Sequence, residues 1–172
     1  MEHEFVSLIW GIETFHRVKH PEKPASSRVQ NKIQRIIDQI KLSRDRKWLA
    51  EQLEHAHEPS LETRIFQVLR ELPIEFDDKG LKKFAHECAE RRNAISHFGG
   101  QRQRDKDGTT TSSDLMKKGE VLGYLYHTLI MQEIGIEKDI LRQWLYEGFR
   151  SYHIKRILRE AGLLVVEAAT PS

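Results

Sequence analysis

Hydrophobic residues recur at intervals of three and four along most of the chain, with charged and polar residues between them. This spacing is typical of amphipathic α-helices, because 3.6 residues make one helical turn. Helices are predicted over residues 5–17, 27–40, 45–55, 60–72, 81–97, 113–134, 137–149 and 150–161. The pattern therefore predicts an all-α fold, a mostly up-and-down bundle of about six to eight helices.

The breaks between these segments do not divide the chain into domains. Residues 21–27 form a short linker rich in proline and serine, and residues 99–112 form a polar, glycine-flanked loop that we expect to be flexible. Both are short, so we expect a single domain over residues 1–172 with a core from about residue 5 to 160. Asp77 and Asp78 are candidate caps for the helix after Gly80, and Gly135 is expected to end the long helix before it.

The helix after Gly80 has two contrasting faces. Its core-facing stripe consists of Leu81, Phe84, Ala85, Cys88 and Ile95, and the opposite stripe consists of His86, Glu90, Asn93 and His97. The second stripe contains no lysine, unlike an ordinary solvated face, and it ends with a histidine one turn after an asparagine. This end of the helix is therefore the candidate site.

Arg92 falls inside the apolar stripe of the same helix. A buried guanidinium without a partner is very costly, so Arg92 must reach outward or meet a carboxylate. Glu13, at the edge of the apolar face of the first helix, is the nearest candidate for that carboxylate. Two interpretations stay open for each residue: Arg92 is a structural ion pair or a rigidly held site residue, and Glu13 is its partner or a solvated rim residue.

Other potential ligand residues have simpler explanations. His16 and His20 share a helix face and His55 and His57 flank a turn, but neither pair has the third ligand that zinc requires. The single cysteine, Cys88, lies on the core stripe and is expected to be a small buried hydrophobe rather than a nucleophile. We therefore predict no metal site.

Composition limits the cellular compartment and the kinds of binding partner that we expect. Charged residues make up 31% of the chain, mean hydropathy is −0.60, and no long apolar run could span a membrane. The acidic N-terminus lacks the basic start of a signal peptide, so we expect a cytoplasmic protein. The net charge of +2 is too small to indicate nucleic-acid binding by the whole surface. Any RNA-binding surface must be local or formed by oligomerisation.

Two segments resemble a known family. The run Arg92-Asn93-Ala94-Ile95-Ser96-His97 resembles the R-N-x-x-x-H form of the Arg-x(4 to 6)-His motif of HEPN domains, which are small helical bundles. The segment Leu8-Ile9-Trp10-Gly11-Ile12-Glu13-Thr14-Phe15-His16-Arg17 is similar to the first helix of the ApeA-like branch, the C-terminal HEPN domains of ApeA antiphage proteins. The resemblance extends from about Phe5 to Leu145 and implies a HEPN-type bundle.

The resemblance also implies an activity. Many HEPN domains are endoribonucleases that need no metal or other cofactor, and the implied catalytic residues here are Arg92, Asn93 and His97. The implied partners are RNA, with tRNA as one candidate, and a second copy of the chain, because the family forms a composite cleft between two motif helices. The implied setting is antiphage defence by abortive infection. ApeA-like proteins carry a large N-terminal regulatory region, so we expect this chain to be an excised effector domain or a stand-alone relative.

Further residues have secondary roles in this interpretation. Glu13, Glu90 and His86 are expected to support the site, and Arg102, Arg104, Lys106, Tyr124 and His127 are candidates for substrate binding. The polar loop that carries the three cations also contains acids, and Tyr124 and His127 also suit packing at the rim of the core. The alternative function is a non-catalytic HEPN module that binds nucleotides, RNA or another protein.

Overall fold

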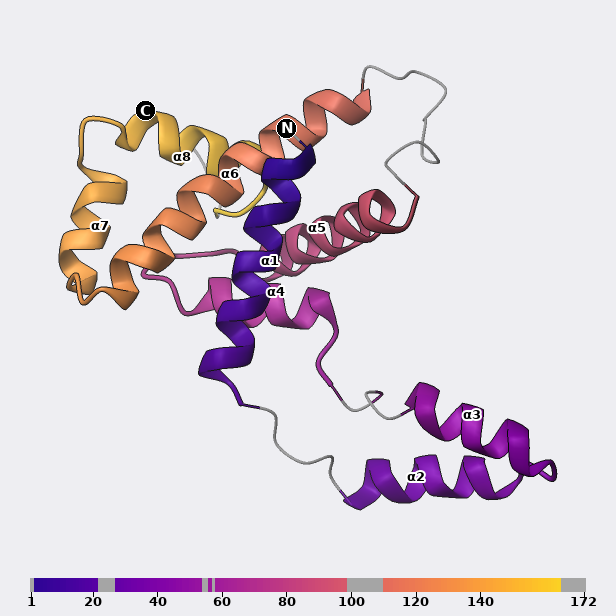
Figure 1. Ribbon diagram of the computed structural model, residues 1–172. Helices are drawn as coiled ribbons and strands as arrows, with labels where there is room; N and C mark the ends of the chain where they lie inside the picture. The colour runs from indigo at the N-terminus through magenta and orange to yellow at the C-terminus, as the bar shows by residue number, and fades with distance from the viewer. Residues whose placement is uncertain (1, 22–26, 54–55, 57, 99–109, 165–172) are drawn as a thin grey trace.

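The structure is a computed structural model that describes residues 2–21, 27–53, 56, 58–98 and 110–164, without the side chains of 97–98 and 110–112. Eight α-helices occupy these residues: α1 (Glu2–Lys19), α2 (Ser27–Asp38), α3 (Ser43–Leu53), α4 (Leu61–Arg70), α5 (Asp78–Phe98), α6 (Thr110–Glu133), α7 (Lys138–Tyr146) and α8 (Ser151–Glu160). The predicted all-α class is confirmed. In Figure 1, α1 and α4–α8 gather into one bundle, and α2 and α3 project from it as a hairpin.

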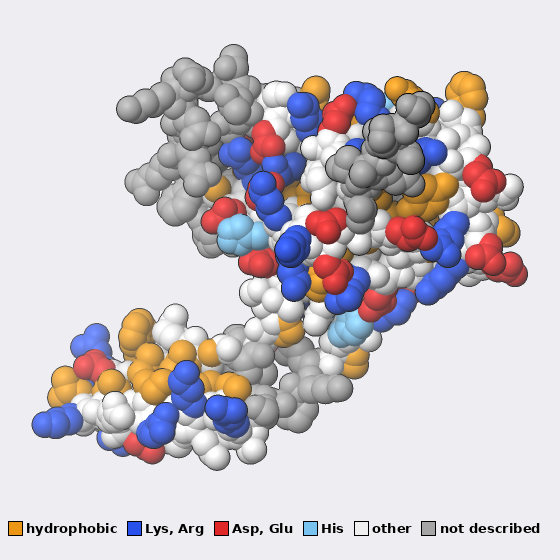
Figure 2. Space-filling model, turned by 180° about the vertical axis from the view of Figure 1, so that it is seen from behind, with side chains coloured by type: hydrophobic (Ala, Val, Ile, Leu, Met, Phe, Trp, Pro, Cys, Tyr) orange, Lys and Arg blue, Asp and Glu red, His pale blue; other side chains and the backbone are white. Residues whose placement is uncertain are grey.

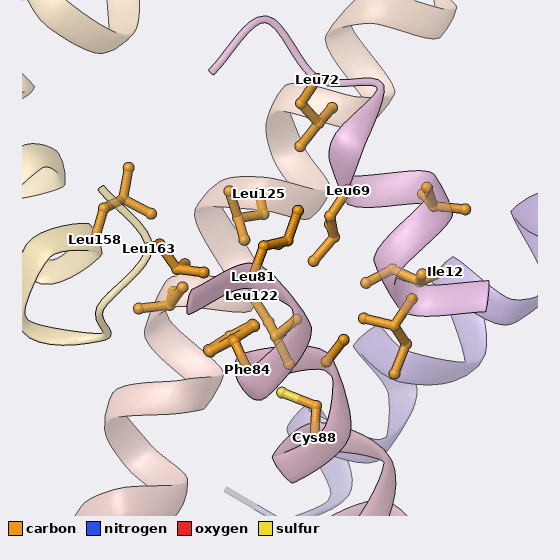
Figure 3. Packing of buried hydrophobic residues seen from close by; sticks show 14 of the residues in the cluster. Ile12, Leu69, Leu72, Leu81, Phe84, Cys88, Leu122, Leu125, Leu158 and Leu163 are labelled. Atoms are coloured by element: carbon orange, nitrogen blue, oxygen red, sulfur yellow. The ribbon is translucent and has the colours of Figure 1, made fainter. Parts of the chain in front are cut away.

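The core lies where α1, α4, α5, α6 and α8 meet. Apolar side chains from all five helices converge there, as Figure 3 shows for Ile12, Leu69, Leu81, Phe84, Cys88, Leu122 and Leu158. The predicted apolar face of α5 is buried from Leu81 to Cys88, and Ile95 is only partly buried. Burial of one face of α5 therefore leaves the candidate stripe on its other face open.

Local signals at the helix ends agree with the sequence. The Ser60 hydroxyl accepts a hydrogen bond from the Thr63 amide and caps α4, and the Asp77 carboxylate accepts one from the Gly80 amide and caps α5. Gly135, at φ 92°, ends α6, and the Ile136 amide bonds back to the Met131 carbonyl in a Schellman pattern. These caps define where α5 begins and where α6 ends.

Some predicted boundaries were wrong by a few residues. The helix predicted over 113–134 begins at Thr110, so residues 110–112 of the predicted loop are helical and only 99–109 lie outside the described residues. The helix predicted over 137–149 ends at Tyr146, and the Gly148 amide then donates a hydrogen bond back to the Gln143 carbonyl at 3.0 Å. A Cβ at Gly148 would lie 2.7 Å from the Trp144 carbonyl oxygen, so this turn suits glycine. Neither difference moves the candidate site.

The hairpin of α2 and α3 stands apart from the core. Ile37 is the one buried residue of α2, and α3 has none. The two helices pack mainly on each other, while Ile36, Leu42 and Trp48 stay exposed. The apolar periodicity predicted both helices correctly, but it does not specify whether an apolar face enters the common core.

The chain after α8 returns to the start of α5. Gly162, at φ 69°, ends α8 and turns the chain so that the Leu163 carbonyl accepts a hydrogen bond from the Asp77 amide at 2.9 Å. Leu164 then forms an antiparallel bridge with Phe76. A Cβ on Gly80 would lie 1.8 Å from the Gly162 carbonyl oxygen, so this close approach requires glycine at position 80.

Replacing Gly80 by alanine tests this contact. The methyl group would collide with backbone, so we expect Gly80→Ala to lower the free energy of unfolding by about 2–3 kcal/mol in urea denaturation. The matched control is Gly119→Ala in α6, where the added Cβ meets nothing within 4 Å. That change should stabilise the protein by about 0.5–1 kcal/mol through helix propensity. Equal effects of the two changes would contradict the close approach.

Candidate active site at the end of α5

The last turns of α5 lie against α1 where Arg92 meets Glu13. Arg92 Nη2 is 3.3 Å from Glu13 Oε2, and the two side chains are 22% and 21% exposed. The predicted ion pair is therefore present. At this partial burial the pair is less screened than a surface ion pair, and it fixes the direction of the guanidinium.

Asn93 completes the contacts of the Arg92 guanidinium. Arg92 Nη1 donates a hydrogen bond to Asn93 Oδ1 at 3.1 Å, while the Asn93 side chain stays exposed. The Arg92 Nε is buried and has no hydrogen-bond partner among the described residues. Since a guanidinium has five N–H groups, each terminal nitrogen keeps one N–H for a further acceptor. An anion at the helix surface could therefore still bind the outer edge of Arg92.

His97 lies in the same helix, one turn after Asn93. The helix continues to Phe98, so the whole segment from Arg92 to His97 has helical register. Positions four residues apart share a helix face, which places His97 and Asn93 on the same side of α5. The side chain of His97 lies outside the described residues.

Glu13 also belongs to a longer row of charges. Arg17 Nη2 lies 3.3 Å from Glu13 Oε1, and Arg17 Nη1 lies 3.3 Å from Glu58 Oε2. Glu58 in turn pairs with Arg64 at 2.7 Å, and Arg64 is 2% exposed. The row Arg92–Glu13–Arg17–Glu58–Arg64 thus alternates in charge, and of its contacts only the Arg92–Glu13 pair was predicted. Two sequence signals for the rest were the i, i+4 spacing of Glu13 and Arg17 and the position of Arg64 among the apolar residues of its helix.

The other predicted supporting residues form a second, exposed cluster. His86 Nδ1 donates to Glu62 Oε2 at 2.9 Å, and His86 Nε2 lies 3.5 Å from Glu90 Oε2. The hydrogen bond to Glu62, aided by the charge of Glu90, raises the pKa of His86 above its usual value of 6.5. The stripe of His86, Glu90 and Asn93 is therefore on the open face of α5, as predicted, and Glu62 of α4 is an addition to it.

Two of the candidates for substrate binding, Tyr124 and His127, contact aromatic or histidine rings of neighbouring helices. The Tyr124 ring lies 6.0 Å from the His153 ring of α8, and the His127 ring lies 5.7 Å from the Trp144 ring of α7. These contacts match the alternative of packing at the core rim. The predicted cations Arg102, Arg104 and Lys106 lie outside the described residues.

Packing accounts for Cys88 and His16, whereas His55 and His57 lie outside the described residues. Cys88 is fully buried, and burial raises the pKa of its thiol strongly, so it is an apolar core residue as predicted. The His16 Nε2 bonds Gln67 Oε1 at 2.7 Å inside the bundle. The described residues contain no group of three His, Cys, Asp or Glu side chains suited to a metal ion. Nor does any described helix combine the length and hydropathy needed to cross a membrane.

Comparison with known proteins identifies a family. A family model described as Apea-like HEPN matches residues 6–140, from the first turns of α1 to the start of α7. No curated protein and no solved structure matches the chain. The matched segment contains Glu13 and the whole of α5.

Removing the carboxylate of Glu13 should destabilise the protein. Glu13→Gln leaves Arg92 and Arg17 without their shared partner in a partly buried setting, so we expect a loss of about 1–2 kcal/mol in the free energy of unfolding. The control is Glu160→Gln, which breaks the exposed pair with Arg156 and should cost about 0.5 kcal/mol or less. Urea denaturation of both variants measures the difference. A cost for Glu13→Gln no greater than the control would contradict a structural role for the pair.

The raised pKa of His86 makes a testable pH dependence. Because the folded-state pKa lies above the unfolded value of 6.5, the His86–Glu62 pair stabilises the fold below pH 6.5, and this contribution disappears as the pH rises through the raised pKa. NMR titration should show a His86 pKa above 6.5 that falls toward 6.5 in Glu62→Gln. Glu120→Gln, which removes the partner of His153, should leave the His86 titration unchanged. An unshifted His86 in the wild-type protein would refute the assignment.

Proposed function

The chain belongs to the Apea-like HEPN family, and from this membership we propose that it is an endoribonuclease whose reaction needs no metal ion. The observation that carries the proposal is the position of Arg92, which is held by Glu13 and Asn93 on the helix that also contains His97. HEPN domains are often ribonucleases, and the Arg, Asn and His of the family motif are all present here.

RNA supplies its own nucleophile for this reaction. A base removes the proton of a 2′-hydroxyl, the oxygen attacks the adjacent phosphorus, and the bond to the 5′-oxygen breaks as that oxygen receives a proton. The products are a 2′,3′-cyclic phosphate and a 5′-hydroxyl. His97 is the proposed acid or base, because an imidazole exchanges protons near neutral pH.

Arg92 and Asn93 have complementary roles in the proposal. The outer N–H groups of Arg92 would bind phosphoryl oxygens as negative charge grows on them. Its ion pair with Glu13 already fixes the guanidinium, so little side-chain entropy is lost on binding. Asn93, on the same face as His97, would orient the imidazole or donate to the substrate.

A second copy of the chain would complete the site. Transphosphorylation benefits from separate acid and base groups, whereas one chain supplies one motif histidine. We propose a symmetric homodimer in which two α5 helices face each other and each contributes Arg92, Asn93 and His97. The proposed setting is antiphage defence, with cellular RNA, tRNA among it, as the substrate and an N-terminal regulatory region as the restraint on activity.

Cleavage of RNA in EDTA tests the proposal. The purified chain should cut total RNA and leave cyclic phosphate ends, and His97→Ala and Arg92→Lys should each reduce the rate at least about 100-fold. Arg92→Lys keeps the charge and removes only the planar fork. The matched control is His3→Ala, an exposed histidine at the start of α1, which should cut at the wild-type rate.

The same assay tests the alternatives. Cutting that survives in both variants would come from another site or a contaminant, and RNA binding without any cutting would favour the non-catalytic binding module. A shared site also predicts that the rate per chain falls on dilution below the dimer dissociation constant. A rate per chain that is independent of concentration, together with a monomeric mass, would contradict the composite cleft.

A further inference from the structure

The α2–α3 hairpin has a larger net positive charge than the whole chain. Between Ser27 and Leu53 there are seven lysines and arginines against three acidic residues, a net charge of +4. Because the whole chain has a net charge of +2, the rest of the chain sums to −2. The net charge of the whole chain is therefore small because a basic hairpin is offset by a slightly acidic remainder of the chain.

The cations of the hairpin also differ from those of the bundle in their partners. Most described lysines and arginines of the bundle lie within 4 Å of a carboxylate, as Arg70, Lys118 and Arg142 do. None of the seven hairpin cations forms an ion pair with another residue in the part of the chain that the structure describes. Their charge is thus not neutralised within the described fold.

Three of these cations form a row on one face of α2. Arg28, Lys32 and Arg35 fall within about 60° of one another around the helix axis and extend over about 10 Å along it. They line a shallow hollow together with the polar side chains of Ser27 and Asn31. The apolar residues of α2 lie on a different face, as the separate hydrophobic and basic areas of the hairpin in Figure 2 also show.

We propose that this basic row binds the phosphate backbone of the RNA substrate. Unpaired guanidinium and ammonium groups beside hydroxyl and amide donors match phosphate oxygens, and a row along one helix face matches an extended polyanion. The inference rests on the proposed function, since it assigns part of the surface that holds the same RNA. It adds a binding surface outside the catalytic motif.

The hairpin is attached close to a residue of the ion-pair row. Glu58 lies five positions after Leu53, the end of α3, so this link spans at most about 18 Å. Glu58 pairs with Arg17, which pairs with Glu13, the partner of Arg92. The base of the hairpin is therefore connected to the row of ion pairs that ends at Arg92.

The test measures binding without cleavage. A 2′-O-methyl RNA cannot supply the attacking hydroxyl, so its affinity for the full chain reports contact alone. The triple variant Arg28→Gln, Lys32→Gln and Arg35→Gln should bind it at least about tenfold more weakly, and the slope of log affinity against log salt should fall by about 2. The control removes three exposed bundle cations, Lys138→Gln, Arg150→Gln and Arg159→Gln, and should change affinity less than about twofold.

Each outcome decides the assignment. Equal weakening in the two triple variants, or unchanged binding in the hairpin variant, would overturn it. Binding of phosphatidylserine vesicles that depends on the row, with RNA binding that does not, would assign the surface to lipid and also overturn it. If RNA binding depends on the row but the chain cuts no RNA, the binding role of the hairpin is supported and the nuclease proposal is refuted. If the chain cuts RNA normally and RNA binding does not depend on the row, only the binding role of the hairpin is refuted.

Discussion

Burial of one face of α5 is the constraint on which the described site depends. Leu81, Phe84 and Cys88 pack into the common core, and this fixes the rotation of the helix about its own axis. Once that rotation is fixed, His86, Glu90 and Asn93 must face outward, and Arg92 must lie at the boundary with α1. The orientation of the motif residues thus follows from the packing of apolar residues one to three turns earlier in the same helix.

At the boundary between α5 and α1, an ion pair rather than apolar packing holds the side chain of Arg92. Arg92 could not remain inside an apolar contact without an acceptor, and Glu13 supplies it from α1. Arg92 and Arg17 share Glu13, and Arg17 and Arg64 share Glu58. These contacts connect α1, α4 with the residue before its start, and α5.

Local features of the fold were predictable because their causes are local. The apolar stripe of α5, the caps at Ser60 and Asp77 and the end of α6 at Gly135 each depend on residues within a few positions of one another. The Arg92–Glu13 pair was also predictable, because an arginine within an apolar stripe requires a carboxylate and few were available. The link through Glu58 was not predictable, since it joins residues far apart in the chain through geometry. For the same reason, the periodicity of α2 and α3 did not indicate that their apolar faces would miss the core.

The contact between Leu163 and Asp77 affects the order in which parts of the fold can form during synthesis. Ribosomes deliver the N-terminal helices first, so α1, α4 and α5 exist before Gly162 and Leu163 have been made. Until those residues emerge, the amide of Asp77 lacks its partner and the first turn of α5 has no backbone stop beside Gly80. The start of the motif helix therefore gains this backbone contact only after residues some eighty positions later in the chain have been made.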